Sequence, residues 1–465
     1  MARSKDISAE ALAALGAQAL AETLVAHAAT DTAFRKKLGM MLAAAKGAGS
    51  LASEIDKRLL TIARSRSFVD WDKRKALSQE LDHLRTTIAT RLAEVDAPRA
   101  IELLWDFIGM GDGVLRRVGD GVGEVEEIFG AAMADLGCLS AAAGAGDRHA
   151  LAHRVLSYCD RDDYGGSDAL ISHMSEALGA EGRAEIAKAT EAALQASPLP
   201  EGPQDWAAKA RRRRYAFRLA LLADLERNPD AFIAAIRAGD LEEAHAGDIA
   251  ERLLNAGRPA EALDWLDKPQ RALLTDDVVT TDLRIDALEA LGRKPEAQAE
   301  RWRHFERALS AAHLRAYLKR LPDFEDFEAE QKALNLAGAH SDAARALAFL
   351  IEWRALDCAD RLVRKRAVDL DGRLYEVLRP AAEALDAKFP EAASLLYRRL
   401  VESMLDRGSS KQYPYAARDL KGCSDLAPRL PSPGTIESHA HFLARLRNSH
   451  GRKYGFWGLM EPVNR

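Results

Sequence analysis

The sequence DIAERLLNAGRPAEALDWLDKP, at residues 248–269, contains a complete helical hairpin. Apolar residues recur at helical spacing in both halves, Gly257 ends the first half, and Pro259 opens the second. A lone hairpin cannot bury both of its apolar faces, so hairpins of the same build must stack against it. The stretch therefore predicts an α-solenoid in which Trp265 is buried against the next hairpin.

Related hairpins follow this one along the chain. GRKPEA at 292–297 matches GRPAEA at 257–262 after 35 residues, close to the period of about 34 in tetratricopeptide units. GAHSDA at 338–343 and FPEAA at 389–393 are weaker copies, and the third lies 46 residues beyond the second. Because the offsets drift, we expect an all-α, irregular α-solenoid of stacked helical hairpins, similar to TPR or HEAT arrays, rather than an ideal superhelix.

The composition agrees with a helical array. The chain has 465 residues, which is enough for several domains or one extended solenoid, and only 6% of them are aromatic. Its 66 basic and 71 acidic side chains give a net charge of −5, a balance that neither requires nor excludes a nucleic-acid partner. Charge therefore has to be examined one patch at a time.

The cysteines and the apolar runs indicate a cytoplasmic protein. Cys138, Cys159, Cys358 and Cys423 stand far apart without a CxxC pair, which is typical of isolated thiols in a reducing compartment. The N-terminus lacks the apolar core of a signal peptide, and no segment approaches the roughly 18 apolar residues of a membrane span. We expect no membrane partner.

A Pro-rich stretch marks the clearest internal boundary. QASPLPEGPQDW, at 195–206, interrupts an otherwise continuous helical pattern with three prolines and a glycine. The sequence thus predicts an N-terminal helical subdomain at 1–196, a break at 197–205, and a TPR-like helical repeat subdomain with a C-terminal cap at 206–465.

Five segments carry a resemblance to a known family. They are RSRSFVDWDKR at 64–74, DDYGGSDALI at 162–171, NAGRPAEALDWL at 255–266, PEAASLLYRRLVESML at 390–405 and HFLARLRNSHGRKYGFWGLM at 441–460. With them the chain resembles a bacterial domain-of-unknown-function family of α-helical, tetratricopeptide-like repeat proteins. The last two segments are similar to the helical segment that accompanies SWIM-type zinc fingers, whose CxC and CxH pairs are absent here. The resemblance implies a fold and no activity.

An acidic loop is the first candidate for chemistry. CDRDDYGGSDALI, at 159–171, gathers four aspartates, but a calcium loop that starts at Asp160 needs a glutamate where Ile171 stands. We interpret the segment as an inter-helix loop in which Ser167 or Asp168 caps the next helix. The alternative is a carboxylate site for catalysis or for a different metal.

Three histidines near the C-terminus raise the question of a metal site. In a single helix, His439 and His450 lie about 16 Å apart along the axis, and His439 and His441 point to nearly opposite sides. No two of them share an ion without help from elsewhere. We expect no metal site and no cofactor.

The densest basic patch lies just after the Pro-rich break. Arg211, Arg213, Arg214 and Arg218 are interleaved with Tyr215 and Phe217, a pattern that phosphate-backbone binding would use. The simpler interpretation is a solvated helix that pairs with acidic neighbours. These four arginines are the first candidates for partner binding.

The C-terminal tail is both basic and aromatic. Arg452, Lys453 and Trp457 complete the set of candidate partner-binding residues, since Arg and aromatic side chains are common interface anchors. The simpler interpretation is a terminal cap that lays Phe456 and Trp457 over the last hairpin, as an open-ended array requires.

The sequence contains no catalytic motif: no GxSxG, and no serine or cysteine in a recognisable elbow beside a base. The leading hypothesis is a non-enzymatic α-solenoid scaffold that binds an unknown protein or peptide. The alternative is a nucleic-acid-binding helical repeat protein that uses the 211–218 patch. An enzyme with an acidic site at 160–168 is the least favoured hypothesis.

Overall fold

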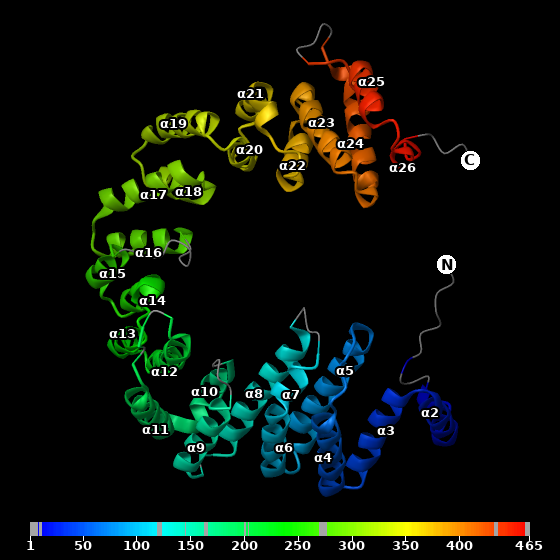
Figure 1. Cartoon of the computed structure of the whole chain (residues 1–465), viewed down its shortest axis with the longest axis vertical. Helices are drawn as coiled ribbons and strands as arrows, with labels where there is room; N and C mark the ends of the chain where they lie inside the picture. The colour runs from blue at the N-terminus through cyan, green and yellow to red at the C-terminus, as the bar shows by residue number, and fades with distance from the viewer. Residues whose placement is uncertain are drawn as a thin grey trace. The chain divides into compact units, whose positions relative to one another are not determined.

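The computed structural model describes residues 8, 12–118, 123–144, 146–161, 166–199, 201–202, 204–268, 277–431 and 436–460. They form α-helices that pack against their neighbours in sequence, which confirms the all-α solenoid (Figure 1). Within these ranges, extended pairing is limited to an isolated bridge between Val69 and Val118. The chain divides into two compact units, Met1–His245 and Ala246–Arg465.

The first unit consists of helices of very different length. Its α-helices are α2 (Ala17–Thr30), α3 (Thr32–Ala45), α4 (Ala48–Arg64), α5 (Trp71–Thr87), α6 (Ala97–Gly109), α7 (Gly111–Leu115), α8 (Glu124–Ala142), α9 (Arg148–Cys159), α10 (Ala169–His173), α11 (Ser175–Ala196), α12 (Trp206–Leu225), α13 (Pro229–Ala238) and the start of α14 (Glu242–Asn255). A π-helical segment, η1 (Ile88–Leu92), continues α5, and a 3-10 turn, η2 (Gly166–Asp168), precedes α10.

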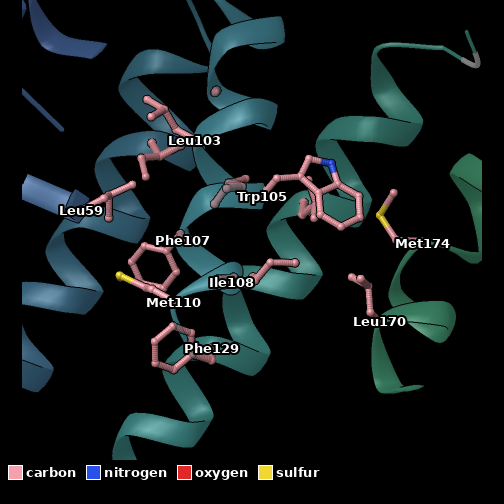
Figure 2. Packing of buried hydrophobic residues seen from close by; sticks show 14 of the residues in the cluster. Leu59, Leu103, Trp105, Phe107, Ile108, Met110, Phe129, Leu170 and Met174 are labelled. Atoms are coloured by element: carbon pink, nitrogen blue, oxygen red, sulfur yellow. The ribbon is translucent and has the colours of Figure 1, made fainter. Parts of the chain in front are cut away.

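The core of the first unit is centred on α6. Its sequence places large apolar side chains on more than one face, so the helix is covered by several neighbours. Figure 2 shows Leu59 from α4, Phe107 from α6 and Phe129 from α8 within this core. The rings of Phe107 and Phe129 have centroids 5.3 Å apart in a tilted arrangement. The side chain of Asp96 caps α6 by accepting a hydrogen bond from the Arg99 amide.

The second unit continues the same construction. Its α-helices are the rest of α14, α15 (Pro259–Leu266), α16 (Asp277–Ala290), α17 (Lys294–Ala308), α18 (Ala311–Leu318), α19 (Glu325–Ala339), α20 (Ala343–Glu352), α21 (Leu356–Arg366), α22 (Tyr375–Leu385), α23 (Pro390–Arg407), α24 (Tyr413–Leu426), α25 (His439–His450) and α26 (Tyr454–Trp457). Short 3-10 turns lie at η3 (Ala367–Asp369), η4 (Ser410–Gln412) and η5 (Ala427–Arg429).

The hairpin at 248–269 has the predicted geometry. Gly257 adopts a φ of 73° between α14 and α15, and Pro259 is the first residue of α15. The amides of Gly257 and Arg258 donate to the carbonyls of Leu254 and Leu253, which is the hydrogen-bond pattern of a Schellman turn. Trp265 is buried, with 6% of its surface exposed.

The second copy of the hairpin repeats this turn in detail. Gly292 has a φ of 74°, and Arg293 donates its amide to the carbonyl of Leu288. Arg258 pairs with Glu261 through Nε and Oε1 at 2.7 Å, and Arg293 pairs with Glu296 at the same distance. The GRPAE and GRKPE sequences are thus two copies of one local structure.

Three further corners use the same turn without glycine. Arg227, Asp240 and Arg354 have φ values of 52°, 55° and 61°, and each is followed by the same pair of hydrogen bonds. Gly338, which the sequence aligns with Gly257 in the third copy, instead lies inside α19. There the next helix starts at the N-cap Asp342, whose side chain accepts from the Arg345 amide.

The two units meet in sequence at a kink. His245 departs from helical dihedrals within α14, and the first unit ends at this residue. The Pro-rich stretch at 197–205 lies inside the first unit, where it joins α11 to α12. These two helices pack against each other and form a hairpin.

Candidate functional site

The basic helix α12 directs one of its arginines into the interior. Arg218 has 1% of its surface exposed and lies between two carboxylates. Its Nη1 donates to Asp160 Oδ1 at 2.9 Å, and its Nε donates to Asp168 Oδ1 at 3.0 Å. The structure therefore joins the basic patch to the acidic loop, although about 50 residues separate them. Asp162 and Asp163 of that loop lie outside the described residues.

Burial controls the titration of this cluster. Burial raises the pKa of the Asp168 carboxyl above its ordinary value, and hydrogen bonding to Arg218 opposes the shift. Burial and the nearby charge of Asp168 raise the pKa of the Cys159 thiol to about 12. Cys159 thus stays protonated at neutral pH, because a thiol with so high a pKa forms little thiolate. The contacts assign the cluster a packing role.

The other arginines of the patch are divided between packing and solvent. Arg214 Nη2 lies 3.5 Å from Asp160 Oδ1. Arg212 donates to the carbonyls of Leu194 and Ser197 at the end of α11. Arg211 is exposed and Arg213 is half-buried. Only part of the patch that the sequence suggested is therefore exposed to solvent.

The C-terminal residues pack on the last helices. Phe456 is fully buried, and its ring lies edge-on to Tyr413 of α24. Trp457 donates from Nε1 to the carbonyl of His450 at 3.0 Å. Arg452 is exposed and Lys453 is half-buried. This packing matches the terminal cap that the sequence predicts.

The C-terminal histidines lie on one helix, as expected, and contact separate partners. His439 Nε2 lies 3.1 Å from Ser424 Oγ, and His450 Nε2 lies 3.3 Å from Asp406 Oδ1. In the described part of the chain, no three His, Cys, Asp or Glu side chains gather as metal ligands.

A groove of the first unit lies between α3, the segment at 65–69 and α5. It has a volume of about 760 Å³, and we call it the α3–α5 groove. One part of its lining is apolar and is formed by Phe34, Met40, Phe68, Val69, Ala76 and Leu77. Phe68 has 63% of its surface exposed at the edge of this apolar wall.

Four cations and two carboxylates also line the groove. Lys36 Nζ lies 3.0 Å from Glu80 Oε2, and Arg58 from outside the lining binds the same carboxylate. Burial alone would raise the pKa of Glu80, but hydrogen bonds from Arg58 and Lys36 outweigh it and lower the pKa. Glu80 is thus an ionised carboxylate that two cations already hold.

The remaining cations of the groove have no such partner among the described residues. Lys37 and Lys73 are exposed and form no ion pair with any residue that the structure describes. Arg117 donates to neutral acceptors, the Ile62 carbonyl at 2.9 Å and Ser65 Oγ at 3.3 Å. Burial and the charge of Lys37 lower the pKa of His83, which also lines the groove. The groove therefore combines an apolar wall with uncompensated positive charge.

Sequence reasoning did not identify this groove. Its residues come from three segments between 31 and 117, and only the packing of α3 on α4 and α5 brings them together. A local signal exists in RSRSFVDWDKR, where the apolar Phe68 and Val69 stand between basic residues.

The described helices include none that is long and apolar enough to cross a membrane.

Comparisons with known proteins bear on the fold and the family. A comparison with curated proteins finds no match. Among solved structures, a protein described as "Circular tandem repeat protein with novel repeat topology and enhanced subunit contact surfaces" is 17% identical, over 91% of this chain and 94% of that one. Its TM-score of 0.18 is too low to carry an argument. A family model matches residues 2–459, and the chain therefore belongs to a family of unknown function, DUF6880.

Proposed function

We propose that this protein is a non-enzymatic helical scaffold that holds a segment of a protein partner in the α3–α5 groove. The observation that supports the proposal is the composition of the groove, in which an apolar wall lies beside Lys37 and Lys73, two lysines that form no ion pair with any described residue. A volume of about 760 Å³ falls within the range of roughly 300–1,000 Å³ that is typical of ligand pockets.

The two parts of the groove have different roles in this proposal. Burial of apolar side chains against Met40, Val69 and Leu77 supplies affinity, at roughly 25 cal/mol per Å² of apolar surface removed from water. Lys37 and Lys73 attract an acidic partner and orient it. Solenoids commonly present extended surfaces of this kind between their stacked helices.

A nucleic-acid partner fits the described residues less well. Arg218 is buried in an ion-pair cluster, so only Arg211 and Arg213 of the expected patch present much surface. We infer a cytoplasmic location from the four free thiols, two of which are buried. The similarity of the two C-terminal segments to the helical segment of SWIM-type zinc-finger proteins stays a prediction.

Fluorescence anisotropy tests the proposal. Labelled peptides of equal apolar content but different net charge are titrated with the whole chain, and a single-stranded RNA is used as a competitor. We expect the acidic peptides to bind most tightly, and Lys37→Glu with Lys73→Glu to weaken them at least tenfold. Lys75→Glu, on the same helix but outside the groove lining, serves as the control. Equal binding of all charges, no effect of the groove variant, or displacement by RNA would each contradict the proposal.

A further inference from the structure

The second unit exposes a short segment that is both aromatic and acidic. It reads PDFEDFE, at 322–328, and leads into α19. All seven residues are exposed. Phe324 has 90% of its surface in solvent and Phe327 has 66%, and the two are three positions apart at the start of the helix. Two neighbouring exposed phenylalanines form an apolar surface of the kind that marks interaction sites.

The backbone of this segment is strained at Phe324. Its φ of 75° places a bulky aromatic residue in the left-handed region that favours glycine. Such a conformation in a residue other than glycine costs about 1 kcal/mol or more. The ring is almost fully exposed to solvent, so its contacts within the described part of the chain offset little of this strain energy. A strained backbone position thus carries a ring that lies almost wholly in solvent.

The segment also carries negative charge that no described residue neutralises. Asp323, Glu325, Asp326 and Glu328 form no ion pair with any described residue. Acidic residues in the first turn stabilise a helix through its dipole, which accounts for part of this pattern. The dipole does not account for two phenylalanines in solvent between the carboxylates.

We propose that the segment at 322–328 of one copy of this chain docks into the α3–α5 groove of a second copy. The inference rests on the proposed function of the groove and names its occupant. Phe324 and Phe327 supply apolar side chains for the wall formed by Phe34, Met40 and Leu77. The four carboxylates of the segment can form ion pairs with the groove lysines, which have no such partner among the described residues. Each surface thus carries both of the features that the other one needs.

The contact joins two different surfaces, so it is head-to-tail. A heterologous contact of this kind leaves one segment and one groove free in every open assembly, and it builds either open chains or closed rings, of which a dimer with two reciprocal contacts is the smallest. Association then depends on concentration and weakens as salt rises, because part of the attraction is between exposed charges.

Sedimentation velocity of the whole chain over a range of concentrations tests the proposal. A groove variant carries Lys37→Glu and Lys73→Glu, and a segment variant carries Phe324→Ser and Phe327→Ser. We expect the unaltered chain to form dimers and larger species, and each variant alone to stay monomeric. An equimolar mixture of the two variants retains one intact groove and one intact segment, so it should form a one-to-one dimer and nothing larger.

Two matched controls accompany these variants. Lys75→Glu alters an exposed lysine of α5 outside the groove lining, and Val368→Ser alters an exposed apolar residue of the second unit. Both should associate as the unaltered chain does. Thermal unfolding followed by circular dichroism verifies that every variant is folded.

The outcomes separate this inference from the proposed function. An unaltered chain that is monomeric at every concentration overturns the self-docking, and so does a mixture of the two variants that forms no dimer. If acidic peptides still bind the groove in either case, the scaffold function stands without it. If the chain associates but neither variant reduces the association, another surface is responsible and the self-docking is again wrong.

Discussion

Two basic and aromatic regions of the first unit look alike in sequence and differ in structure. Helix α12 turns Arg218 into the interior between two carboxylates, where 1% of its surface is exposed. The α3–α5 groove leaves Lys37 and Lys73 in solvent, without an ion pair among the described residues. The denser charge run thus places one arginine in the interior, whereas the two lysines of the groove stay in solvent.

The difference shows that the number of basic residues in a stretch does not decide whether it can bind a partner. What decides it is whether nearby carboxylates neutralise those residues. A buried guanidinium has to be paired, because removing an ion from water costs several kcal/mol. An exposed lysine has no such requirement, and its field extends into solvent until salt screens it. A run of arginines therefore does not by itself mark a binding surface. The positions of the carboxylates decide whether it is one.

Removal of the buried cation should have the largest effect. Arg218→Met leaves the carboxylate of Asp168 buried without its partner, and breaking a buried pair in this way costs about 3–5 kcal/mol. We expect a loss of that size in the free energy of unfolding, measured by urea denaturation. Arg211→Met, on the exposed side of the same patch, should change it by less than about 0.5 kcal/mol.

A second substitution should restore part of the stability that Arg218→Met removes. Asp168→Asn in the Arg218→Met background removes the orphaned charge, so it should recover part of the lost stability. A loss below about 1 kcal/mol for Arg218→Met would show that Asp168 finds another partner or solvent, and the two regions would then differ less than their burial suggests.

Salt should affect the two regions differently. Raising the ionic strength from about 0.1 M to 1 M shortens the Debye length from about 10 Å to 3 Å. We expect acidic peptides to bind the α3–α5 groove about tenfold more weakly, a change of about 1.4 kcal/mol. The contribution of Arg218, measured as the difference in stability from Arg218→Met, should stay nearly constant. If the peptide affinity does not change with ionic strength, the apolar wall alone accounts for binding.

The fold was predictable where the turn chemistry is visible in sequence. Gly257 and Pro259 predict a turn between two helices. In the structure, Gly257 is left-handed and a helix begins at Pro259. The corners at Arg227 and Arg354 have the same geometry but carry no glycine, and only the first has a local signal, in the N-cap Asn228 and in Pro229 at the start of the next helix. The helices around them form because packing of their apolar faces outweighs the strain of one residue.

The site was less predictable because it depends on distant contacts. The burial of Arg218 follows from the meeting of α12 with Asp160 and Asp168, more than 40 residues earlier in the chain, and no spacing rule anticipates that meeting. The terminal cap was easier to predict, since Phe456 and Trp457 have only the adjacent helices to cover. The aromatic segment at 322–328 was missed, although its phenylalanines alternate with carboxylates in plain view.

Backbone strain offers a third test, with effects near 1 kcal/mol. Arg354→Gly and Phe324→Gly each remove the backbone strain of a non-glycine residue in the left-handed region. We expect each substitution to raise the free energy of unfolding by about 0.5–1 kcal/mol. Gly257→Ala introduces such strain and should lower it by about 1 kcal/mol. Phe324→Gly should also weaken self-association, whereas Arg354→Gly should not. Equal association of the two variants would remove any functional reason for the strain at Phe324.

The smallest expected effect is a difference in the pH dependence of two carboxyls. The pKa of Glu80 is lowered, so its contribution to stability is present above its ordinary pKa of 4.5 and is lost as the pH falls through the lowered value. The pKa of Asp168 is raised, so its contribution falls as the pH rises from 3.8 through the raised value. Stability profiles of Glu80→Gln and Asp168→Asn between pH 3 and 7 should therefore depart from that of the unaltered chain with opposite slopes. Departures of the same sign would mean that the ion pair with Arg218 outweighs burial at Asp168, and the buried cluster would then respond to acid as the exposed groove does.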